Sequence, residues 1–583
     1  MIRKLIRQML AAQTLAALAV SVCLLIDNIM IGQFLGEEGL AAYSLANPVL
    51  LFIGAVGSML TAGAQVACSR SLGSGSREET DRGYSSAIVL GLGFSLVFMM
   101  IVLVFRNMLA TAMGAGSEGS LYDQTRNYMA GFVIGAPAMM GALVLVPFLQ
   151  MAGQSALLIG SVLGMAAVDV GLDLANALVF KGGMFGMGLA SALSYYTTLV
   201  IAMAGYFLRK KCVFRFSPKL ISGKKIRELA VGGVPSIFGM ASSVVLVFVL
   251  NHILMGVGGS AAVAAYSASM TIGNSANCVS TGVGGVSLTL SGILYNEEDR
   301  TGLKEMLRLL AVYGVFLGIG MGVILLLFAP ALVSIFIPTA GSAQTMAVLG
   351  TRLFAAGLIP CCMNNVLKSM YQGTERVKIT ETMSVLEGAV LPAAAAFILS
   401  RFMNETGVWL NFFAGETLAL LGISLYVWKK SGRVGVTTDN YLMLKDGFGV
   451  KPEDLLEMDI HSMEDVIAAS EKAKRFCLDH GQGPKTANHI ALCIEEMASN
   501  TVKHGSFGGK GKNHLSVRVQ HKAERWTLRF RDDCGEFDPV RYVPREGKDA
   551  LGIRLVMAMA DDVRYTYSMN MNNLTIKLHA REE

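Results

Sequence analysis

The chain has 583 residues, of which 53% are hydrophobic and 16% charged, and its formal net charge is +6 at pH 7. Soluble domains carry about 25% charged residues, so this composition, with its repeated long apolar runs, excludes a wholly soluble protein and indicates a polytopic membrane protein. The basic residues gather in loops that flank the apolar runs, which argues against nucleic acid as a partner. The length leaves room for more than one domain.

Long apolar runs follow one another from Met9 to Trp428. A membrane-spanning helix needs about 20 apolar residues, and on that rule this region contains about twelve spans. The expected cores are residues 9–32, 40–67, 84–105, 128–149, 156–179, 186–208, 231–254, 262–291, 309–329, 346–370, 380–400 and 407–428. The sequence therefore predicts an all-α membrane region of about 12 transmembrane helices.

Positive charge marks one side of this membrane region. Arg3, Lys4 and Arg7 precede the first span, and the connector after the sixth span, from Arg209 to Arg227, is strongly basic. The loop between the first two spans contains no lysine or arginine. Loops rich in these residues stay in the cytoplasm, and the number of spans is even. We therefore expect both termini to be cytoplasmic.

The two halves of the membrane region match when one is shifted by about 223 residues. Six spans lie on each side of the basic connector, so the copies share one orientation and form a parallel repeat. We expect a six-helix N-lobe over 1–215, a six-helix C-lobe over 216–430, and a site near mid-membrane between or within them. Asp27 falls on Leu250, so ion-linked chemistry is expected in the N-lobe. The matched pairs are Asn28 with Asn251, Tyr43 with Tyr266, Arg77 with Arg300, Phe105 with Phe328 and Pro137 with Pro360.

Asp27 stands alone as an acidic residue in the first apolar run. An aspartate at the centre of a membrane helix costs about 2.5–3.5 kcal/mol on insertion scales, and such residues usually face a cavity and have a function. The alternatives are an aspartate that reaches water from near a helix end and one that bonds a neighbouring helix. Glu387 and Glu416, in the last two spans, are weaker acidic candidates. Lys368, near a helix end, is expected to snorkel to the interface.

Other side chains and glycines have simpler interpretations. Phe52, Tyr43 and Tyr266 are candidates for lining a cavity. The segment Gly282–Gly285 is expected to mark close helix packing and not a ligand loop.

Several motifs along the membrane region resemble the multidrug and toxic compound extrusion (MATE) transporters. The resemblance spans about residues 1–430. It implies a twelve-helix, two-lobe antiporter that expels organic cations or other amphiphiles against H⁺ or Na⁺. The motifs are Asp27–Gly32, Leu40–Pro48, Gly73–Glu79, Leu172–Asp173, Gly186–Ser191 and Lys225–Pro235.

The acidic pair that this family uses in its N-lobe maps to Asp27 and Asp173. The sequence departs from the family at Asp169, where asparagine is frequent. Asp169 and Asp173 lie at i, i+4 on one helix face, where like charges repel, so at least one of them is protonated, paired or ion-bound. Such a cluster can carry a proton across the membrane, or it can hold Na⁺ together with helix carbonyls. The sequence leaves H⁺ and Na⁺ both open as the coupling ion.

The composition changes after Trp428. Residues 431–450 form a linker, and 451–583 have the composition of a soluble domain. The periodicity predicts helices over Met463–Asp479, Pro484–His504 and Gly552–Ala560, and strands over Leu515–Val519, Trp526–Phe530, Val563–Tyr567 and Leu574–Leu578. This order fits an α+β domain with helices on one face of a mixed sheet.

The second predicted helix of this tail carries Glu496 and Asn500 on one face, at i, i+4. That spacing lets a carboxylate activate a nucleophile while an amide oxygen reaches Mg²⁺. Arg531–Pro539 follows a predicted strand directly, and Gly552 lies further on. Together these residues resemble the GHKL (Bergerat-type) ATPases, and most closely the anti-sigma-factor serine kinases of bacteria, over about 451–580.

The resemblance implies ATP and Mg²⁺ as cofactors of the tail. Glu496 is then the base, Asn500 the Mg²⁺ ligand and Asp532 the residue that reads adenine. Aligning on the Asp-x-Gly spacing selects Asp533 in place of Asp532, and we favour Asp532. Of the lid's glycine pattern only Gly552 is clear. ATP binding is therefore expected, whereas serine/threonine kinase activity and a non-catalytic domain both remain open.

Two functions from different classes follow. The first is a cation-coupled exporter in a bacterial plasma membrane, whose ATP-binding tail regulates it. ATP is not expected to drive transport, because the chain has no Walker-type phosphate-binding motif. The second is a membrane-anchored anti-sigma-type serine kinase or switch, with the transporter half as sensor and an anti-anti-sigma-like protein as partner.

Overall fold

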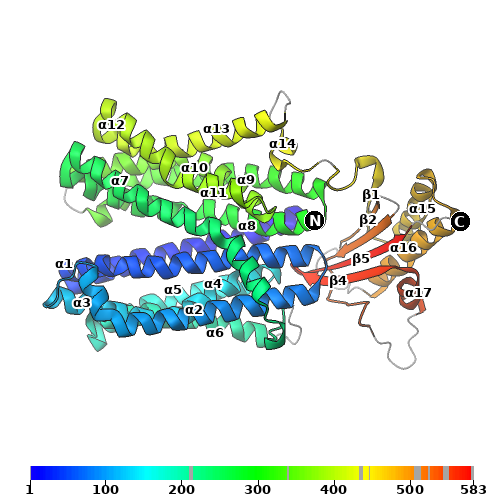
Figure 1. The fold of residues 1–583 in the computed structure, drawn as a ribbon, viewed down its shortest axis with the longest axis horizontal. Helices are drawn as coiled ribbons and strands as arrows, with labels where there is room; N and C mark the ends of the chain where they lie inside the picture. Colours follow the sequence, from blue (N-terminus) through cyan, green and yellow to red (C-terminus); the bar gives the residue numbers. More distant parts are fainter. Residues whose placement is uncertain are drawn as a thin grey trace.

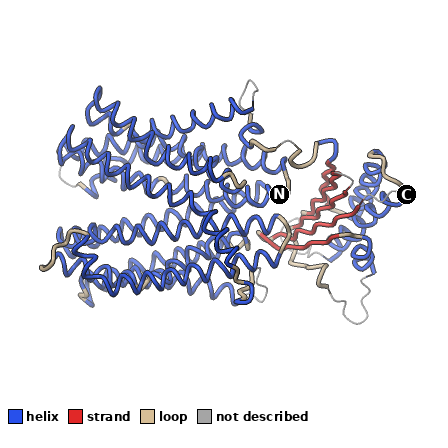
Figure 2. The backbone as a smooth tube through the Cα atoms, viewed as in Figure 1, coloured by secondary structure: helices blue, strands red, loops and turns tan. Residues whose placement is uncertain are grey.

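The computed structural model describes residues 2–208, 214–337, 341–431, 437–445, 447–504, 514–522, 525–542 and 551–579. A long helical bundle occupies one end of the molecule and a small α+β domain, the tail, occupies the other (Figure 1). The strands of the described chain all lie in the tail (Figure 2).

The first half of the bundle, the N-lobe, contains six candidate spans. Two of them, Leu5–Gly36 and Glu38–Gly73, make up α1, and the helices α3 and α4 make a single span bent by 47°. A short π-helix, η1, ends the fifth span. The N-lobe elements are α1 (Ile2–Gly73), α2 (Arg77–Ala112), α3 (Ser120–Val133), α4 (Ala136–Met151), α5 (Ser155–Ala175), η1 (Asn176–Phe180) and α6 (Gly183–Leu208).

The second half, the C-lobe, repeats this plan, again with a π-helix, η3, in its fifth span. Eleven described helices are long and apolar enough to cross a membrane, or twelve with the bent pair as one span. The prediction of about twelve spans is confirmed. The C-lobe elements and their connectors are η2 (Pro218–Leu220), α7 (Gly223–Ala276), α8 (Cys278–Asn296), α9 (Arg300–Phe336), α10 (Ser342–Gly373), α11 (Val377–Val385), η3 (Leu386–Val390), α12 (Leu391–Trp409), α13 (Asn411–Ser431) and α14 (Thr438–Leu442).

The backbone carries the predicted repeat. α1 breaks at Gly36 with φ 72° and ψ −168°, and α7 breaks at Gly259 with φ 66° and ψ −161°. The two glycines lie 223 residues apart, which is the shift found in the sequence. Both have positive φ, where a side chain is strained and glycine is not. The same turn therefore separates the first two spans of each lobe.

Glycines let the two lobes approach each other closely. A Cβ added to Gly282 of α8 would lie 2.4 Å from the hydroxyl of Thr14, and one added to Gly285 would lie 2.8 Å from the amide of Gln13. Both partners belong to α1. The interpretation of Gly282–Gly285 as a packing segment is confirmed, because any larger side chain would push α1 and α8 apart.

The tail is a five-stranded sheet with helices on the side away from the bundle (Figure 1). Its strand order is β1-β2-β3-β5-β4, and each pair is antiparallel. The expectation of a mixed sheet is therefore wrong for the described strands. The tail elements are η4 (Pro452–Asp454), β1 (Leu455–Ile460), α15 (Met463–Asp479), α16 (Pro484–His504), β2 (Leu515–Lys522), β3 (Arg525–Asp532), α17 (Leu551–Met559), β4 (Asp562–Ser568) and β5 (Met571–His579).

Strand β1 was not predicted from the sequence. Its residues, Leu455–Ile460, include two acidic residues and only one β-branched residue, so their β-propensity is weak. Two predicted segments lie partly outside the described residues. Residues 543–550 belong to the predicted lid, and residues 209–213 belong to the start of the basic connector.

Candidate functional site

Three aspartates meet inside the N-lobe. Asp27 comes from the first span of α1, whereas Asp169 and Asp173 come from consecutive turns of α5, and their exposed fractions are 7%, 3% and 1%. Asp27 is close enough to both α5 carboxyls to interact with them. The three residues therefore form one buried acidic cluster, which we call the N-lobe carboxylate cluster.

A cavity adjoins this cluster. One oxygen of Asp27, one of Asp169 and both of Asp173 have no hydrogen-bond partner within the described chain. Burial of unpaired polar groups is costly, so the cluster is suited to a cation that it can take up and release. The cavity is lined by Val20, Cys23, Asp27, Tyr43, Leu50, Tyr128, Phe132, Met165, Asp169, Ser191, Ser194 and Tyr195, and this lining contains no lysine or arginine.

The C-lobe holds a different arrangement of buried charge. Lys368 of α10 forms an ion pair with Glu387, which the π-helix η3 presents. Asn364, also on α10, donates from Nδ2 to Glu416 Oε2 at 2.7 Å. The expectation that Lys368 snorkels to the interface is therefore wrong. These two buried acidic residues of the C-lobe face a lysine and an amide, whereas the three aspartates of the N-lobe face one another.

The aromatic residues predicted to line a cavity divide between the two lobes and the surface. Tyr43 lines the N-lobe cavity. Tyr266 instead stacks on Trp409 in the C-lobe core, with ring centroids 5.3 Å apart. Phe52 is 54% exposed and stacks on Phe98 at the outer surface. Of the three residues, only Tyr43 lines the N-lobe cavity.

The predicted nucleotide site of the tail lies between α16 and α17, on the helical side of the sheet. Glu496 and Asn500 lie one turn apart on α16. Gly552, in the first turn of α17, packs so closely that an added Cβ would lie 1.8 Å from a carboxylate oxygen of Glu496. Only glycine at 552 therefore leaves room for the Glu496 carboxylate. Carboxylate and amide oxygens are ligands that Mg²⁺ accepts, so the chemistry of Glu496 and Asn500 is compatible with the expected Mg²⁺–nucleotide complex.

The two candidate adenine readers face different neighbours. Asp532 is buried in the position of β3 that faces the helices, where it accepts bonds from Asn572 Nδ2 at 2.8 Å and from the Cys534 N–H at 3.0 Å. Burial raises the pKa of the Asp532 carboxyl, and these two bonds oppose the rise. Asp533 instead accepts from the backbone N–H of His514 at the start of β2. Asp532 is therefore the one of the two that lies on the helical side.

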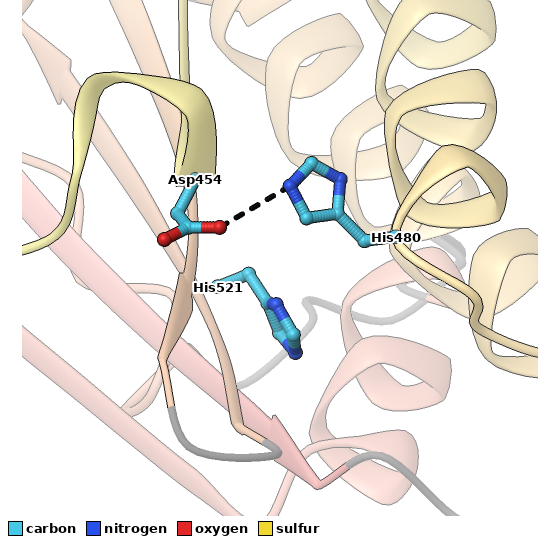
Figure 3. A group of neighbouring side chains, drawn as sticks. All are labelled: Asp454, His480 and His521. Atoms are coloured by element: carbon cyan, nitrogen blue, oxygen red, sulfur yellow. Dashed lines mark ion pairs between the residues drawn. The ribbon is translucent and has the colours of Figure 1, made fainter.

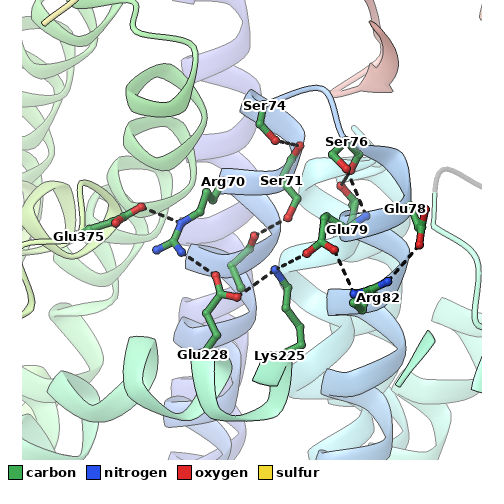
Figure 4. A network of polar contacts seen from close by, with 12 residues as sticks. Arg70, Ser71, Ser74, Ser76, Glu78, Glu79, Arg82, Lys225, Glu228 and Glu375 are labelled. Atoms are coloured by element: carbon green, nitrogen blue, oxygen red, sulfur yellow. Dashed lines mark hydrogen bonds and ion pairs between the residues drawn. The ribbon is translucent and has the colours of Figure 1, made fainter. Parts of the chain in front are cut away.

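Ion pairs join the two lobes at the end of the bundle nearest the tail (Figure 4). Arg70, at the end of α1, pairs with Glu228 of α7 at 2.6 Å and with Glu375, which follows α10, at 2.7 Å. Lys225 of α7 pairs with Glu79 of α2 at 3.3 Å. This end of the bundle is therefore closed by contacts that the lobes must break in order to separate.

The tail contacts the loops of both lobes at that same end. On the C-lobe side, three consecutive acidic residues before α9 form ion pairs with basic side chains of the sheet. Arg531 pairs with Glu297 at 2.7 Å, and Lys522 and Arg518 pair with the next two residues, Glu298 and Asp299. We call Glu297–Asp299 the acidic loop.

On the N-lobe side the contacts use backbone oxygens. Arg564 Nη1 donates to the carbonyl of Ser74 at 2.8 Å, and Asn570 Nδ2 donates to the carbonyl of Gly153 at 2.8 Å. The Met569 N–H donates to the carbonyl of Met151 at 2.7 Å. The tail therefore bridges both lobes through one face of its sheet and the turn between β4 and β5.

This docking surface was not predicted from the sequence. The signal was a run of three acidic residues, Glu297–Asp299, after the eighth span, together with basic residues at alternate positions on two strands, such as Arg529 and Arg531. Alternate residues share one face of a strand. Nothing local to either segment, however, shows that the two surfaces meet.

The chain matches two family models. The model described as MatE covers residues 13–170 and 235–398, together more than half of the chain, and the model described as a histidine kinase-like ATPase domain covers 461–578. The multidrug export protein MepA of Staphylococcus aureus is 23% identical over 433 residues, which cover 71% of this chain and 90% of that protein.

Solved structures share the fold of the bundle. One shows the outward-facing conformation of a multidrug resistance MATE family transporter of the MOP superfamily; it is 19% identical, with a TM-score of 0.68, and the match covers 74% of this chain and 96% of that one. Another, a MOP superfamily transporter from Pyrococcus furiosus, is 19% identical, with a TM-score of 0.69 and coverage of 76% and 97%. The chain is thus a multi-pass membrane protein that belongs to the MATE family and carries a histidine kinase-like ATPase domain as its tail.

Proposed function

We propose that this protein is a cation-coupled exporter of amphiphilic organic compounds, regulated by an ATP-binding tail on the cytoplasmic side. The observation that carries the proposal is the N-lobe carboxylate cluster, which is buried, borders a cavity and has no lysine or arginine in the cavity lining. Intramembrane carboxylates in such positions typically serve ion pathways. The multidrug export named for the S. aureus relatives supports the substrate class.

Repulsion within the N-lobe carboxylate cluster explains why it would exchange one cation for another. A bound H⁺ or Na⁺ offsets the repulsion among Asp27, Asp169 and Asp173, and loss of that ion restores it. The cavity holds about 30 Å³, which suits an ion and is too small for an organic cation. Once the lobes rearrange and widen it, an organic cation would meet the same carboxylates, so ion and substrate compete for one negative site. Competition of this kind couples the inward movement of one to the outward movement of the other as the lobes rearrange.

Transport under separate ion gradients tests the coupling. Full-length protein in proteoliposomes is given an H⁺ gradient or a Na⁺ gradient, and the export of a fluorescent organic cation is measured. Asp27→Asn is expected to lower gradient-driven export by about tenfold or more, because the first carboxylate no longer exchanges its cation. Asp123→Asn, which alters a surface ion pair with Arg126, is the matched control. Export by Asp27→Asn at the control rate under both gradients would refute the coupling.

We further propose that the docked tail restrains transport. The tail contacts Glu297 in the C-lobe and Ser74 and Gly153 in the N-lobe, at the end that the inter-lobe ion pairs close. Opening of that end moves the lobes relative to each other, so contacts to both lobes at once oppose the movement. The tail must release one lobe or deform before this end opens, and docking therefore favours the closed state.

A short chain of contacts links the predicted nucleotide site to this docking face. Asp532 accepts from Asn572 Nδ2, and the next residue, Asn573, accepts from Arg531 Nε at 2.7 Å. Arg531 in turn pairs with Glu297 of the acidic loop. A nucleotide held at Asp532 would act on the strand pair that positions Arg531. Regulation by ATP then consists of a change in docking strength and needs no ATP-driven transport step.

Charge reversal at the acidic loop tests this restraint. Glu297→Arg places a cation against Arg531 and is expected to undock the tail and raise the export rate by about fivefold. The measurements are hydrogen exchange of β2 and β3 and export in proteoliposomes. The swap Glu297→Arg with Arg531→Glu restores the pair and should restore both readings, and Arg475→Glu, on the exposed face of α15, is the control. An undocked tail with an unchanged export rate would refute the restraint.

The serine-kinase alternative is favoured by one observation. The docked face of the sheet is opposite the helical side that carries Glu496 and Asn500, so docking leaves the predicted nucleotide site free of transporter contacts among the described residues. This alternative expects phosphate transfer from ATP to an anti-anti-sigma-like protein. That transfer would be abolished by Glu496→Ala and unaffected by Asp27→Asn. Absence of ATP binding by the full-length protein would remove both roles of the tail.

A further inference from the structure

Two histidines and an aspartate meet at a corner of the tail that neither the transporter nor the predicted nucleotide site uses. Asp454 ends η4, His480 follows α15, and His521 lies near the end of β2. One ligand atom from each residue lies within 4.8 Å of the others (Figure 3). Segments from three separate parts of the tail therefore converge on one point with side chains that bind metals.

The hydrogen bonds of His480 leave a conflict at this point. Its Nδ1 lies 2.8 Å from the carbonyl oxygen of Phe476, which only accepts, so Nδ1 carries a proton. In the neutral ring Nε2 then holds a lone pair, and it faces Asp454 Oδ1 at 3.3 Å. Two acceptors oppose each other across this gap. Either a second ring proton or a cation between the two atoms resolves the conflict.

His521 supplies a third donor. Its ring stacks on Trp526, with centroids 4.4 Å apart and planes at 23°, which fixes its orientation. One of its ring nitrogens lies within 4.8 Å of the ligand atoms of Asp454 and His480. The ring of His480 lies nearly edge-on to it, with centroids 5.6 Å apart. A second proton on His480 joins only His480 and Asp454, whereas a metal ion would engage a ring nitrogen of His521 as well.

We propose that Asp454, His480 and His521 form a binding site for a transition-metal ion of the Zn²⁺ class. Imidazole nitrogens and a carboxylate oxygen are Zn²⁺ ligands at about 2.0–2.2 Å, and ligand atoms around a tetrahedral ion are then about 3.3 Å apart. The gap between His480 and Asp454 has this length, and His521 needs a small side-chain movement to join them. The carbonyl of Phe476 holds His480 by its other nitrogen, as outer partners do at metal sites.

Three protein ligands leave one position of a tetrahedral ion for water. Partial solvent access agrees with this, since the side chains of His480 and Asp454 are 20% and 29% exposed. The place of the site in the chain suggests its role. Asp454 lies where the linker enters the tail, and His521 precedes Lys522, which pairs with Glu298 of the acidic loop. The bound ion would tie the linker entry to the strand end that docks on the C-lobe.

Cobalt serves as a spectroscopic probe of the site. Untagged full-length protein in detergent is titrated with Co²⁺, and we expect one equivalent to produce the visible absorption of a four-coordinate ion and Zn²⁺ to displace it. His480→Gln, His521→Gln and Asp454→Asn should each weaken binding by at least about tenfold. The matched control is His579→Gln, because His579 forms a histidine–aspartate pair with Asp561 that has no second histidine. It should bind like the wild type.

The outcomes separate a metal site from an ordinary ion pair. Binding that survives His521→Gln at wild-type affinity, or that is lost equally in His579→Gln, would overturn the proposal, as would no one-equivalent band in the wild type. A second measurement uses the wild-type protein alone, so its result does not depend on whether the variants fold. Because Trp526 stacks on His521, bound Co²⁺ should quench part of the tryptophan emission, and Zn²⁺ should restore it. Quenching that Zn²⁺ does not reverse would also overturn the site.

Discussion

The two lobes share one helical plan but hold buried charge in opposite ways. In the N-lobe, three aspartates lie together beside a cavity whose lining has no lysine or arginine. In the C-lobe, Lys368 pairs with Glu387, and Asn364 bonds Glu416. The position that matches Asp27 is Leu250, which is fully buried in the C-lobe core. The two lobes thus differ in what their buried carboxylates face: a lysine and an amide in the C-lobe, and other carboxylates in the N-lobe.

This difference separates a binding role from a structural role. A carboxylate that already has a cation or an amide partner loses that partner if it binds another ion, so exchange is costly. A carboxylate without one gains by taking up an ion. The shared fold alone would not distinguish the lobes, whereas the partners of each acidic residue do. Three substitutions test the distinction, in order of decreasing effect.

The largest effect is expected at Lys368. Lys368→Met removes the cation and leaves Glu387 buried and unpaired, which costs about 3–5 kcal/mol for a buried ion pair. Thermal unfolding of the full-length protein in detergent should show a marked loss of stability. The double variant Lys368→Met with Glu387→Met removes both charges and should recover most of it. A single variant as stable as the wild type would mean that the C-lobe pair is not structural.

A smaller effect of opposite sign is expected at Asp169. Asp169→Asn removes one of two like charges at i, i+4 and keeps a polar group that can donate to Asp173. We expect a stability gain of about 1 kcal/mol in thermal unfolding, because the native cluster holds mutual repulsion. The gradient-driven export rate should fall at the same time. Destabilisation by Asp169→Asn would show that the cluster already contains a firmly bound partner.

Much of the fold was accessible from the sequence because its signals are local. Apolar run length identified the spans, and the repeat shift of 223 reappears in the glycine breaks at Gly36 and Gly259. Tail helix α15 has the predicted bounds. Its start is set by a capping box in which the side chains of Ser462 and Asp465 bond each other's backbone N–H groups. Strand β1 lacked any such local signal.

Contacts between distant segments were less accessible. Asp27 was identified because an aspartate is costly in an apolar run. Its proximity to Asp169 and Asp173 was expected only from the resemblance to a family, because the sequence of a single helix does not determine which other helix packs against it. Lys368 was expected to snorkel because a lysine near a helix end does so when no acidic partner is close. Its partner, Glu387, belongs to another span, so the local sequence around Lys368 did not reveal it. The docking of Arg531 on the acidic loop escaped for the same reason.

The smallest effect is expected at Glu416, and it gives the sharpest test of the comparison. Glu416→Gln removes the charge but keeps an oxygen that accepts from Asn364 Nδ2, so the bond now measured at 2.7 Å can persist. Stability should change by about 1 kcal/mol or less, the size of one net hydrogen bond. Gradient-driven export should stay within about threefold of the wild-type rate. A change of that size corresponds to less than the 1.4 kcal/mol in activation free energy that a tenfold change in rate requires. If Glu416→Gln instead abolished export as Asp27→Asn is expected to do, the C-lobe would carry a second ion site, and hydrogen bonding to Asn364 would not be what distinguishes the lobes.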